Sequence, residues 1–204
     1  MIEIETPHGP ARAHLHAAKR PRAALLLGHG AGGGVAAPDL VAATATAVAA
    51  GVSVAVVEQP YRVAGRRNAA PAAQLDAAWI AVAAHLRAHE LKRLPLLAGG
   101  RSSGARVACR TATALDATGV LCLAFPLLPP PRAGSAKVPE SRLPELELAT
   151  VPTLVVQGAR DRFGIPPAAA SREVVVVPGD HGLRSNPGPI GAAVDRWLRA
   201  LLGS

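Results

Sequence analysis

A serine stands between two glycines in residues 100–104, whose sequence Gly-Arg-Ser-Ser-Gly fits the pattern G-x-S-x-G. The apolar run 94–97 precedes this segment and a helical pattern follows it, so the serine occupies a turn between a strand and a helix. A turn this sharp is strained and leaves no room for side chains two positions away on either side. It exposes the hydroxyl of Ser102 beside a helix N-terminus, where free N–H groups favour an oxyanion. We therefore predict that Ser102 is a nucleophile, and the alternative is an ordinary glycine-rich turn.

A serine hydroxyl is a weak nucleophile, so it needs a base within reach and a carboxylate that orients the base. Asp161 follows the apolar run 153–156, and His181 follows the run 173–177. Because the carboxyl ends of parallel strands meet at one edge of a sheet, we expect the three residues together there, in the chain order Ser, Asp, His. His181 is the predicted base and Asp161 its carboxylate. Asp180 could compete as the acid, but adjacent residues rarely face each other.

A glycine-rich segment, residues 28–34, follows the apolar run 23–27. Glycine lets backbone N–H groups approach a substrate closely. We predict that the N–H groups of Ala31 and Ser103 form an oxyanion hole. A phosphate-binding loop is the alternative, but two apolar residues stand where a P-loop requires Lys-Ser or Lys-Thr. The dinucleotide pattern G-x-G-x-x-G can also be matched here, although a single match within a run of glycines is weak.

Arginines occur near the same predicted edge of the sheet. Arg62 belongs to the segment after the run 52–57, and Arg101 flanks the nucleophile. Guanidinium groups bind carboxylates and phosphates in a bidentate manner. We take His29, Arg62 and Arg101 as candidate substrate-binding residues, which would suit an anionic group on the substrate. The alternative is structural pairing with Glu58 or with carbonyl groups of the loop.

Two histidines, His85 and His89, are four residues apart on a predicted helix, a spacing that can hold a metal ion. We expect no third ligand nearby and therefore a solvated helix face instead of a metal site. His14 and His16 alternate on a predicted edge strand and are expected to be exposed. No metal ion and no cofactor is predicted.

Strands and helices are predicted to alternate along most of the chain. Residues 1–5 and 11–16 alternate in polarity and indicate a hairpin. The short apolar runs typical of buried parallel strands are residues 23–27, 52–57, 94–97, 120–125, 153–156 and 173–177. Helical patterns cover residues 38–50, 71–89, 103–117 and 188–202, and residues 59–70 are expected to form a loop. This alternation predicts an α/β fold with a mostly parallel sheet, helices on both faces and a mixed edge.

One domain spanning residues 1–204 fits the length of the chain. No repeat or linker divides it. Residues 126–149 contain six prolines and little periodicity, so we expect a long loop there and no helical lid domain.

The composition limits the classes of protein that the chain can represent. Half of the residues are apolar, which excludes a wholly disordered chain. The net charge is +8, but the arginines are scattered and aromatic residues are only 2%, so we expect no nucleic-acid partner. Cys109 and Cys122 are too few for a disulfide framework and are predicted in the core.

Residues 40–57 are apolar but are split by Gly51, which indicates a helix and a strand and not a membrane span. The first residues are acidic where a signal peptide is basic, so we expect a cytoplasmic protein with no membrane partner.

Several segments match a known family. They are residues 27–32 (Leu-Gly-His-Gly-Ala-Gly), 59–67 (Gln-Pro-Tyr-Arg-Val-Ala-Gly-Arg-Arg), 100–106 (Gly-Arg-Ser-Ser-Gly-Ala-Arg), 125–127 (Phe-Pro-Leu), 152–158 (Pro-Thr-Leu-Val-Val-Gln-Gly) and 180–181 (Asp-His). Together the segments resemble those of small α/β-hydrolases related to dienelactone hydrolase. More narrowly, they resemble a group of bacterial predicted hydrolases and their animal testis-expressed and NSL-complex-subunit relatives.

The resemblance implies an α/β-hydrolase fold and a triad made by Ser102, Asp161 and His181, and it says little about the substrate. Two positions depart from the pattern of the group. Leu128 stands where a histidine is expected after Phe-Pro-Leu, and Arg162 stands where a proline is expected after Arg-Asp. The first departure bears on the pocket and the second on the loop that carries the acid.

We expect a serine hydrolase that cleaves a carboxylic ester or thioester of a small molecule through an acyl-enzyme intermediate. A non-catalytic binding or scaffold protein on the same fold is the alternative, because a fold alone does not establish activity. A module that binds anions through the glycine loop and the arginines is a third possibility. Peptidase and acyltransferase activity stay open because the same triad serves both, and so does the oligomeric state.

Overall fold

The computed structural model describes residues 1–130, 139–184 and 187–203. Its strands are β1 (Ile2–Ile4), β2 (Ala11–His16), β3 (Ala23–Gly28), β4 (Val52–Glu58), β5 (Leu96–Arg101), β6 (Gly119–Leu123), β7 (Thr153–Gly158) and β8 (Arg172–Val177). Its helices are α1 (Pro38–Ala49), α2 (Pro60–Val63), α3 (Ala72–Ala88), α4 (Ser103–Thr111), α5 (Leu143–Glu147) and α6 (Pro187–Leu202).

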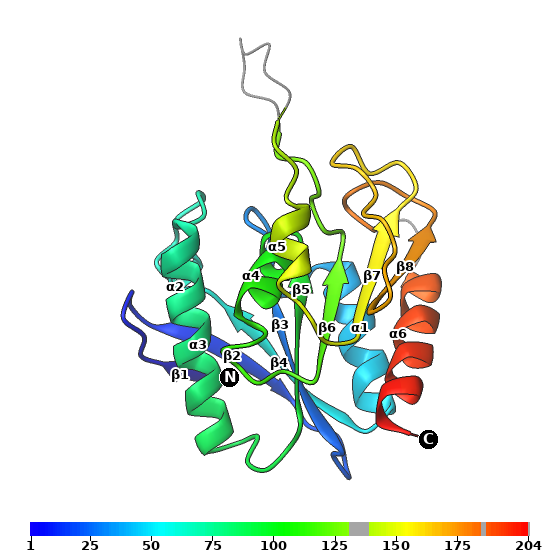
Figure 1. Cartoon of the computed structure of the whole chain (residues 1–204). Coiled ribbons are helices and arrows are strands. Elements are labelled where there is room, and N and C mark those ends of the chain that lie inside the picture. Colours follow the sequence, from blue (N-terminus) through cyan, green and yellow to red (C-terminus); the bar gives the residue numbers. More distant parts are fainter. Residues whose placement is uncertain (131–138, 185–186, 204) are drawn as a thin grey trace.

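The strands form one eight-stranded sheet in the order β1-β2-β4-β3-β5-β6-β7-β8 (Figure 1). The strands from β4 to β8 in this order are parallel, and β1 and β2 join them as an antiparallel hairpin along β4. The predicted mostly parallel sheet with a mixed edge is confirmed. This is the α/β-hydrolase fold.

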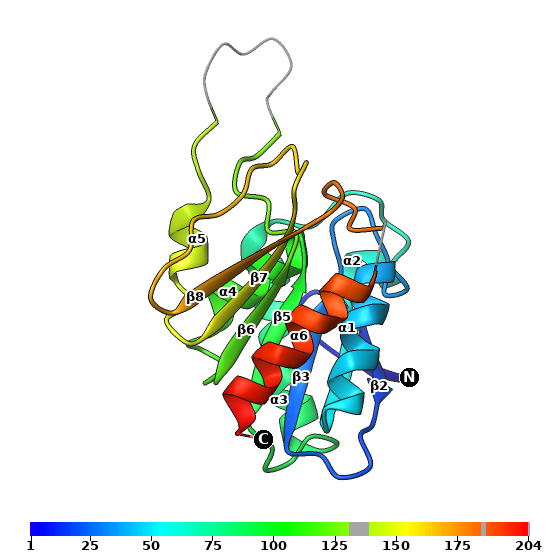
Figure 2. The ribbon, with the colours of Figure 1, turned by 90° about the vertical axis from the view of Figure 1, so that its right-hand side faces the viewer.

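Helices cover both faces of the sheet. Helices α1 and α6 lie side by side on one face (Figure 2), and α3, α4 and α5 lie on the other (Figure 1). Each face buries its own apolar cluster, in which Leu25 and Leu27 of β3 point to the first face and Leu26 to the second. A strand buried on both faces must be apolar at every position, which is why β3 appears as a continuous run in the sequence. None of the described helices has the length and apolar character that crossing a membrane requires.

Three expected boundaries were wrong. Residues 59–70 are not all loop, because Pro60 starts the short helix α2, where its fixed φ suits the first helical position. Strand β5 continues to Arg101 because Gly99 and Gly100 still pair with β6. Helix α4 ends at Thr111, and the chain then turns through Asp116, whose φ is +51°, before it enters β6.

The proline-rich stretch between β6 and β7 contains α5, a helix of five residues that the periodicity did not reveal. Residues 131–138 of this stretch lie outside the described residues. Arg106 and Arg110 of α4 hold α5 against the fold through charged hydrogen bonds to Glu145, and Arg110 also binds Asp76 of α3. In the described part of the stretch there is no helical lid domain over the sheet.

Cys109 and Cys122 are buried free thiols from α4 and β6, and their sulfur atoms lie 3.5 Å apart. The contact with Cys109 and burial together raise the pKa of the Cys122 thiol. A thiol that stays protonated is inert and packs like a small apolar side chain. The prediction that both cysteines belong to the core is confirmed.

Helix α4 approaches β3 so closely that only glycine fits at the contact. A Cβ atom at Gly104 would overlap the backbone of Gly28. Because backbone atoms cannot move aside as the end of a flexible side chain can, we expect Gly104→Ala to lower the free energy of unfolding by about 3 kcal/mol. Denaturant unfolding checks this value. Gly34→Ala is the matched control, since nothing lies within 4 Å of a Cβ there, and equal losses in both variants would contradict the tight contact.

The network around Glu145 predicts a pH-dependent contribution to stability. Burial alone raises the pKa of Glu145, but the hydrogen bonds and charges of Arg106 and Arg110 hold it below its usual value. A carboxylate of this kind stabilises the fold above the pKa of the unfolded state, about 4.3, and loses that contribution as the pH falls through the lower folded value. We expect Glu145→Gln to reduce stability by about 1–2 kcal/mol at neutral pH, because the pair is only partly screened by solvent.

This difference from the wild type should shrink as the pH falls below about 4, where the wild-type side chain becomes neutral as well. Urea unfolding at several pH values measures it. Glu147→Gln is the matched control on the same helix, because Glu147 is exposed and has no partner among the described residues. A loss of stability in Glu145→Gln that is independent of pH would argue against the ion pairs.

Candidate active site

Ser102 occupies the turn between β5 and α4 in a backbone conformation that residues other than glycine rarely adopt, with φ 52° and ψ −106°. Its N–H donates a hydrogen bond to the carbonyl of Leu123 on the next strand, at 2.9 Å. A Cβ at Gly100 would lie 2.6 Å from backbone atoms of Gly28 and Gly104, so the two glycines of the motif are required by space. The strained turn lifts the serine hydroxyl above the carboxyl edge of the sheet.

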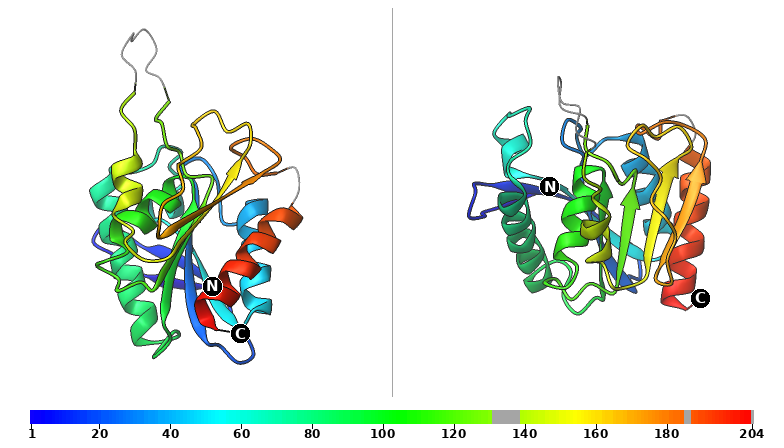
Figure 3. Two further views of the ribbon diagram at one scale, coloured as in Figure 1. Left: turned by 45° about the vertical axis from the view of Figure 1, so that its right-hand side comes forward. Right: turned by 45° about the horizontal axis from the view of Figure 1, so that its top comes forward.

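The other two predicted triad residues meet Ser102 at this edge. His181 Nε2 lies 3.0 Å from Ser102 Oγ, and His181 Nδ1 lies 2.8 Å from Asp161 Oδ2. The loops that carry Asp161 and His181 follow β7 and β8 and lie over the same edge of the sheet (Figure 3). A histidine that contacts a carboxylate on one side and a serine hydroxyl on the other can accept the serine proton through Nε2.

Asp161 is held in place by donors that the sequence analysis did not identify. Gln157 donates to Oδ2 at 2.7 Å, and the N–H of Phe163 donates to Oδ1 at 2.9 Å. Asp161 is buried, whereas Asp180 is exposed and its Oδ1 accepts the N–H of Gly182. The structure therefore directs Asp161, and not Asp180, at the histidine.

The ring of Phe163 packs edge-on against the imidazole of His181, with 4.5 Å between the ring centroids. Phe163 also lines the cavity that contains Ser102. An aromatic ring in this position restricts the tilt of the imidazole and shields it from water on one side. This contact limits how far the histidine can turn away from the serine.

Two free N–H groups border the serine. Within the described residues, neither Ala31 nor Ser103 uses its backbone N–H in a hydrogen bond, and both residues line the cavity at Ser102. The carbonyl of Ala31 accepts a hydrogen bond from the hydroxyl of Tyr61 at 2.9 Å. Burial raises the pKa of Tyr61 to about 12, so this hydroxyl remains a donor. Tyr61 thus fixes the peptide that follows Ala31. His29 Nδ1, 2.8 Å from the carbonyl of Gly30, contacts the peptide that carries the N–H of Ala31. Two unpaired donors suit a negatively charged oxygen.

The cavity at Ser102 has a volume of about 250 Å³. Its walls are apolar and basic. The residues that line it are Ala31, Ala69, Ala70, Ala72, Leu75, Ser102, Ser103, Arg106, Arg110, Pro126, Pro130, Arg142 and Phe163. Two of its three arginines are paired with Glu145, while the guanidinium of Arg142 has one hydrogen-bond partner among the described residues, the carbonyl of Pro126 at 3.3 Å. Burial and the nearby Arg106 lower the pKa of Arg142, as expected for a cation beside other cations.

Arg101 links two segments of the chain through its guanidinium group. Its Nε lies 2.9 Å from Oδ2 of the fully buried Asp39, and its Nη2 donates to the carbonyl of His181 at 2.9 Å. Burial raises the pKa of Asp39 and the guanidinium of Arg101 opposes that rise. The residue next to the nucleophile therefore connects the start of α1 to the loop of the histidine.

The two other candidate substrate-binding residues do not line the cavity at Ser102. His29 is buried, with Nδ1 2.8 Å from the carbonyl of Gly30 and Nε2 accepting the N–H of Gln59. Burial lowers the pKa of His29, which suits the neutral form that these two contacts require. Arg62 donates to the carbonyl of Arg66 at 3.3 Å. This is the structural pairing with a loop carbonyl that we named as the alternative.

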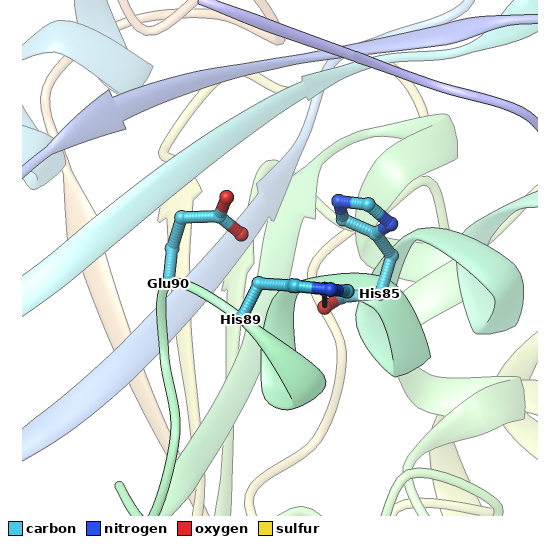
Figure 4. Close-up of side chains that lie close together, drawn as sticks. All are labelled: His85, His89 and Glu90. Carbon is cyan, nitrogen blue, oxygen red and sulfur yellow. Dashed lines mark hydrogen bonds between the residues drawn. The ribbon is translucent and has the colours of Figure 1, made fainter.

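A possible metal site lies elsewhere. Ligand atoms of His85, His89 and Glu90 lie within 4.8 Å of one another at the C-terminal end of α3 (Figure 4), the one such group among the described residues. Our expectation that no third ligand is near the two histidines was therefore wrong, because the chain turns after α3 and brings Glu90 beside them. This end of the helix leads toward the amino end of β5, whereas Ser102 follows its carboxyl end. The group is thus remote from the triad.

A larger apolar hollow of about 580 Å³ lies between α1 and β2 and does not include Ser102. Its walls include Val41, which is exposed, and the two histidines of β2. His16 is exposed as expected, whereas His14 is half-buried and its Nε2 lies 4.0 Å from Glu58. The nucleophile and the residues with free N–H groups line the smaller cavity, and the base contacts the nucleophile at 3.0 Å, so that cavity is the candidate active site.

Several residues of the site carried weak signals in the sequence. Gln157 and Phe163 stand close to Asp161 and could have been considered as its neighbours. Asp39 stands in the first turn of a predicted helix, where acidic residues are common. The sequence therefore gave no sign that it would pair with Arg101. Arg142 lies in the irregular stretch, where no periodicity placed it near the serine.

Solved structures with this fold are similar over nearly the whole chain. A lidless α/β serine hydrolase from Xanthomonas campestris has a TM-score of 0.76 and 18% identity, with 100% of this chain and 94% of that chain covered. The esterase Est1E from Butyrivibrio proteoclasticus, solved with ferulic acid, has a TM-score of 0.78 and 16% identity, with both chains fully covered. A dienelactone hydrolase from Anabaena variabilis has a TM-score of 0.72 and 15% identity, with 98% and 95% covered. At these identities the likeness shows the fold alone.

The sequence comparisons address the family. None of the curated proteins with which the sequence was compared matches it. The family model described as an alpha/beta hydrolase domain matches residues 21–185, which contain Ser102, Asp161 and His181. Because this match spans well over half of the chain, the protein belongs to the alpha/beta hydrolase domain family.

Proposed function

We propose that the protein is a serine hydrolase that cleaves a carboxylic ester or thioester of a small molecule. The observation that carries the proposal is the continuous hydrogen-bonded chain from Ser102 through His181 to Asp161, with distances of 3.0 and 2.8 Å. Ser102 shares one cavity with Ala31 and Ser103, whose backbone N–H groups have no partner among the described residues. A nucleophile, a base, an orienting acid and oxyanion donors are the parts that acyl transfer requires.

In the proposed reaction, Ser102 Oγ forms a bond to the carbonyl carbon while its proton passes to His181 Nε2. The N–H groups of Ala31 and Ser103 bind the oxyanion of the tetrahedral intermediate. The bond from the carbonyl carbon to the leaving oxygen or sulfur then breaks, and that atom takes the proton from His181. Water repeats these steps on the acyl-enzyme, with His181 as base, and releases the acid and free Ser102.

The dimensions and charge of the cavity indicate the acyl group. A volume of about 250 Å³ suits a small acyl chain, and the alanines and prolines of the wall contact its apolar part. Arg142 lacks a carboxylate partner among the described residues, so it is available to a negative charge on the acyl group. An anionic substrate remains our proposal, although it now depends on Arg142 in place of Arg62 and Arg101.

We also propose the narrower kinship with the bacterial predicted hydrolases and the testis-expressed and NSL-complex-subunit relatives. It is supported by the segments 59–67 and 100–106 of the sequence. Contacts of residues from these segments support the proposal. Tyr61 donates to the carbonyl of Ala31, Arg101 pairs with Asp39, and Arg106 borders the cavity of Ser102.

A fluorophosphonate probe tests the activated serine. We expect one adduct, on Ser102, located by mass spectrometry of peptides, because an oxyanion site and a base accelerate attack on phosphorus as they do on a carbonyl. His181→Ala should slow labelling by about 100-fold or more, the usual contribution of a general base. Ser171→Ala, at an exposed serine remote from the site, should label like the wild type. A folded protein that acquires no adduct would make a binding or scaffold role on this fold the better account.

The assignment of the acid can be tested with two neighbouring carboxylates. Asp161→Asn should lower kcat for a p-nitrophenyl ester by about 10⁴-fold, since an amide no longer stabilises the imidazolium or selects its tautomer. Asp180→Asn should change kcat little, because an amide oxygen can still accept the N–H of Gly182. Steady-state kinetics on both variants distinguishes the two residues. A larger loss in Asp180→Asn than in Asp161→Asn would overturn the assignment.

A further inference from the structure

Three arginines line a hollow beside His181 and form no ion pair with a described residue. The hollow has a volume of about 390 Å³, and its walls include Arg160, Arg162, Arg184, Asp180 and His181. All three arginines are exposed, and none of their guanidinium groups forms an ion pair or hydrogen bond with a described residue. By contrast, Arg101, which also lines this hollow, is paired with the buried Asp39.

These arginines come from the two loops that carry the acid and the base. Arg160 and Arg162 flank Asp161, and Arg184 follows His181 by three residues. The guanidinium of Arg162 lies over the ring of Phe163, 4.8 Å from its centroid, and the same ring packs against His181. Arg162 and His181 therefore contact the same aromatic ring and line the same hollow. The position of Arg162 is one at which the resemblance to relatives leads us to expect proline.

The chemistry determines which part of a substrate lies on this side of the site. The oxyanion must point at Ala31 and Ser103, and the leaving atom must come within hydrogen-bond distance of His181 Nε2 to receive its proton. In the proposed function the acyl group occupies the cavity that Ser102 and Phe163 line, whereas His181 lines the separate hollow. The rest of the leaving group must then extend past His181 toward the hollow.

The charge of the hollow favours an anion. Asp180 is the one carboxylate among its lining residues, and its Oδ1 already accepts the N–H of Gly182. Guanidinium groups bind carboxylates and phosphates through paired, charge-assisted hydrogen bonds. Positive charges grouped around a concave surface also raise the local concentration of anionic ligands. We propose that Arg160, Arg162 and Arg184 bind an anionic group, a carboxylate or a phosphate, on the alcohol or thiol part of the substrate. This inference rests on the proposed hydrolase function.

The test uses two pairs of acetate esters, and in each pair the leaving group of one member is anionic and that of the other is neutral. 4-Acetoxybenzoate is compared with the neutral 4-acetoxybenzamide, and 4-acetoxyphenyl phosphate with its dimethyl ester. We expect the wild type to have a higher kcat/KM for the anionic member of at least one pair. The pair with the larger preference distinguishes a carboxylate site from a phosphate site.

A triple variant, Arg160→Gln, Arg162→Gln and Arg184→Gln, should lower the anionic-to-neutral ratio of kcat/KM by about tenfold or more, the effect of losing one or two charge-assisted hydrogen bonds. The matched control is Lys19→Gln, Arg20→Gln and Lys92→Gln, which removes the same charge from exposed positions at the amino edge of the sheet. The control should keep the wild-type ratio. Circular dichroism melting verifies that both triple variants fold.

The outcomes separate this inference from the proposed function. A protein that is labelled at Ser102 and cleaves the neutral esters as fast as the anionic ones overturns the anion site alone. A ratio that falls equally in both triple variants also overturns it, because net charge would then be the cause. A folded protein that takes no label and cleaves none of the four esters overturns both proposals.

Discussion

The close approach of helix α4 to strands β3 and β5 is the constraint on which the site depends. Gly100 and Gly104 pack against the backbone of Gly28 with no space for a Cβ atom, and this contact permits the left-handed turn at Ser102. Without it, α4 would move away from the sheet and the serine could relax into ordinary strand geometry. The same turn places the N–H of Ser103 at the start of a helix, where it has no partner in the described part of the chain. One packing contact thus positions both the hydroxyl of Ser102 and the neighbouring N–H of Ser103.

The remaining groups of the site are positioned by hydrogen bonds from outside the triad. Gln157 and the N–H of Phe163 hold both oxygens of Asp161, so the carboxylate reaches His181 in one orientation. Arg101 holds the His181 loop from the other side through the buried Asp39. Groups fixed before the substrate arrives need little reorganisation during the reaction, which is how such sites stabilise a transition state. Ser102, His181 and Asp161 therefore form one hydrogen-bonded arrangement that neighbouring groups support.

The arginines around the candidate site divide into two classes, and their positions in the sequence do not reveal which class each belongs to. Arg101, Arg106 and Arg110 are engaged by buried or half-buried carboxylates and stabilise the fold. Arg142, Arg160, Arg162 and Arg184 lack acidic partners among the described residues and border the two hollows next to the triad. A paired guanidinium offers little to a ligand, whereas an unpaired one retains its donors. The separation explains how a basic protein can combine internal ion pairs with a positively charged site.

By itself the sequence predicted the mostly parallel sheet and the turn that carries Ser102. Apolar runs such as residues 23–27 have one stable place, a strand buried on both faces, and glycines around Ser102 leave one kind of turn. Tertiary structure alone decided the partners of the charged and polar side chains. Arg101 was expected to face the substrate and instead binds Asp39, and His29 turned inward to Gln59. Periodicity records which face of an element is apolar, but a hydrogen bond between residues about thirty or sixty positions apart depends on how elements pack. The sequence carries no local signal of that packing.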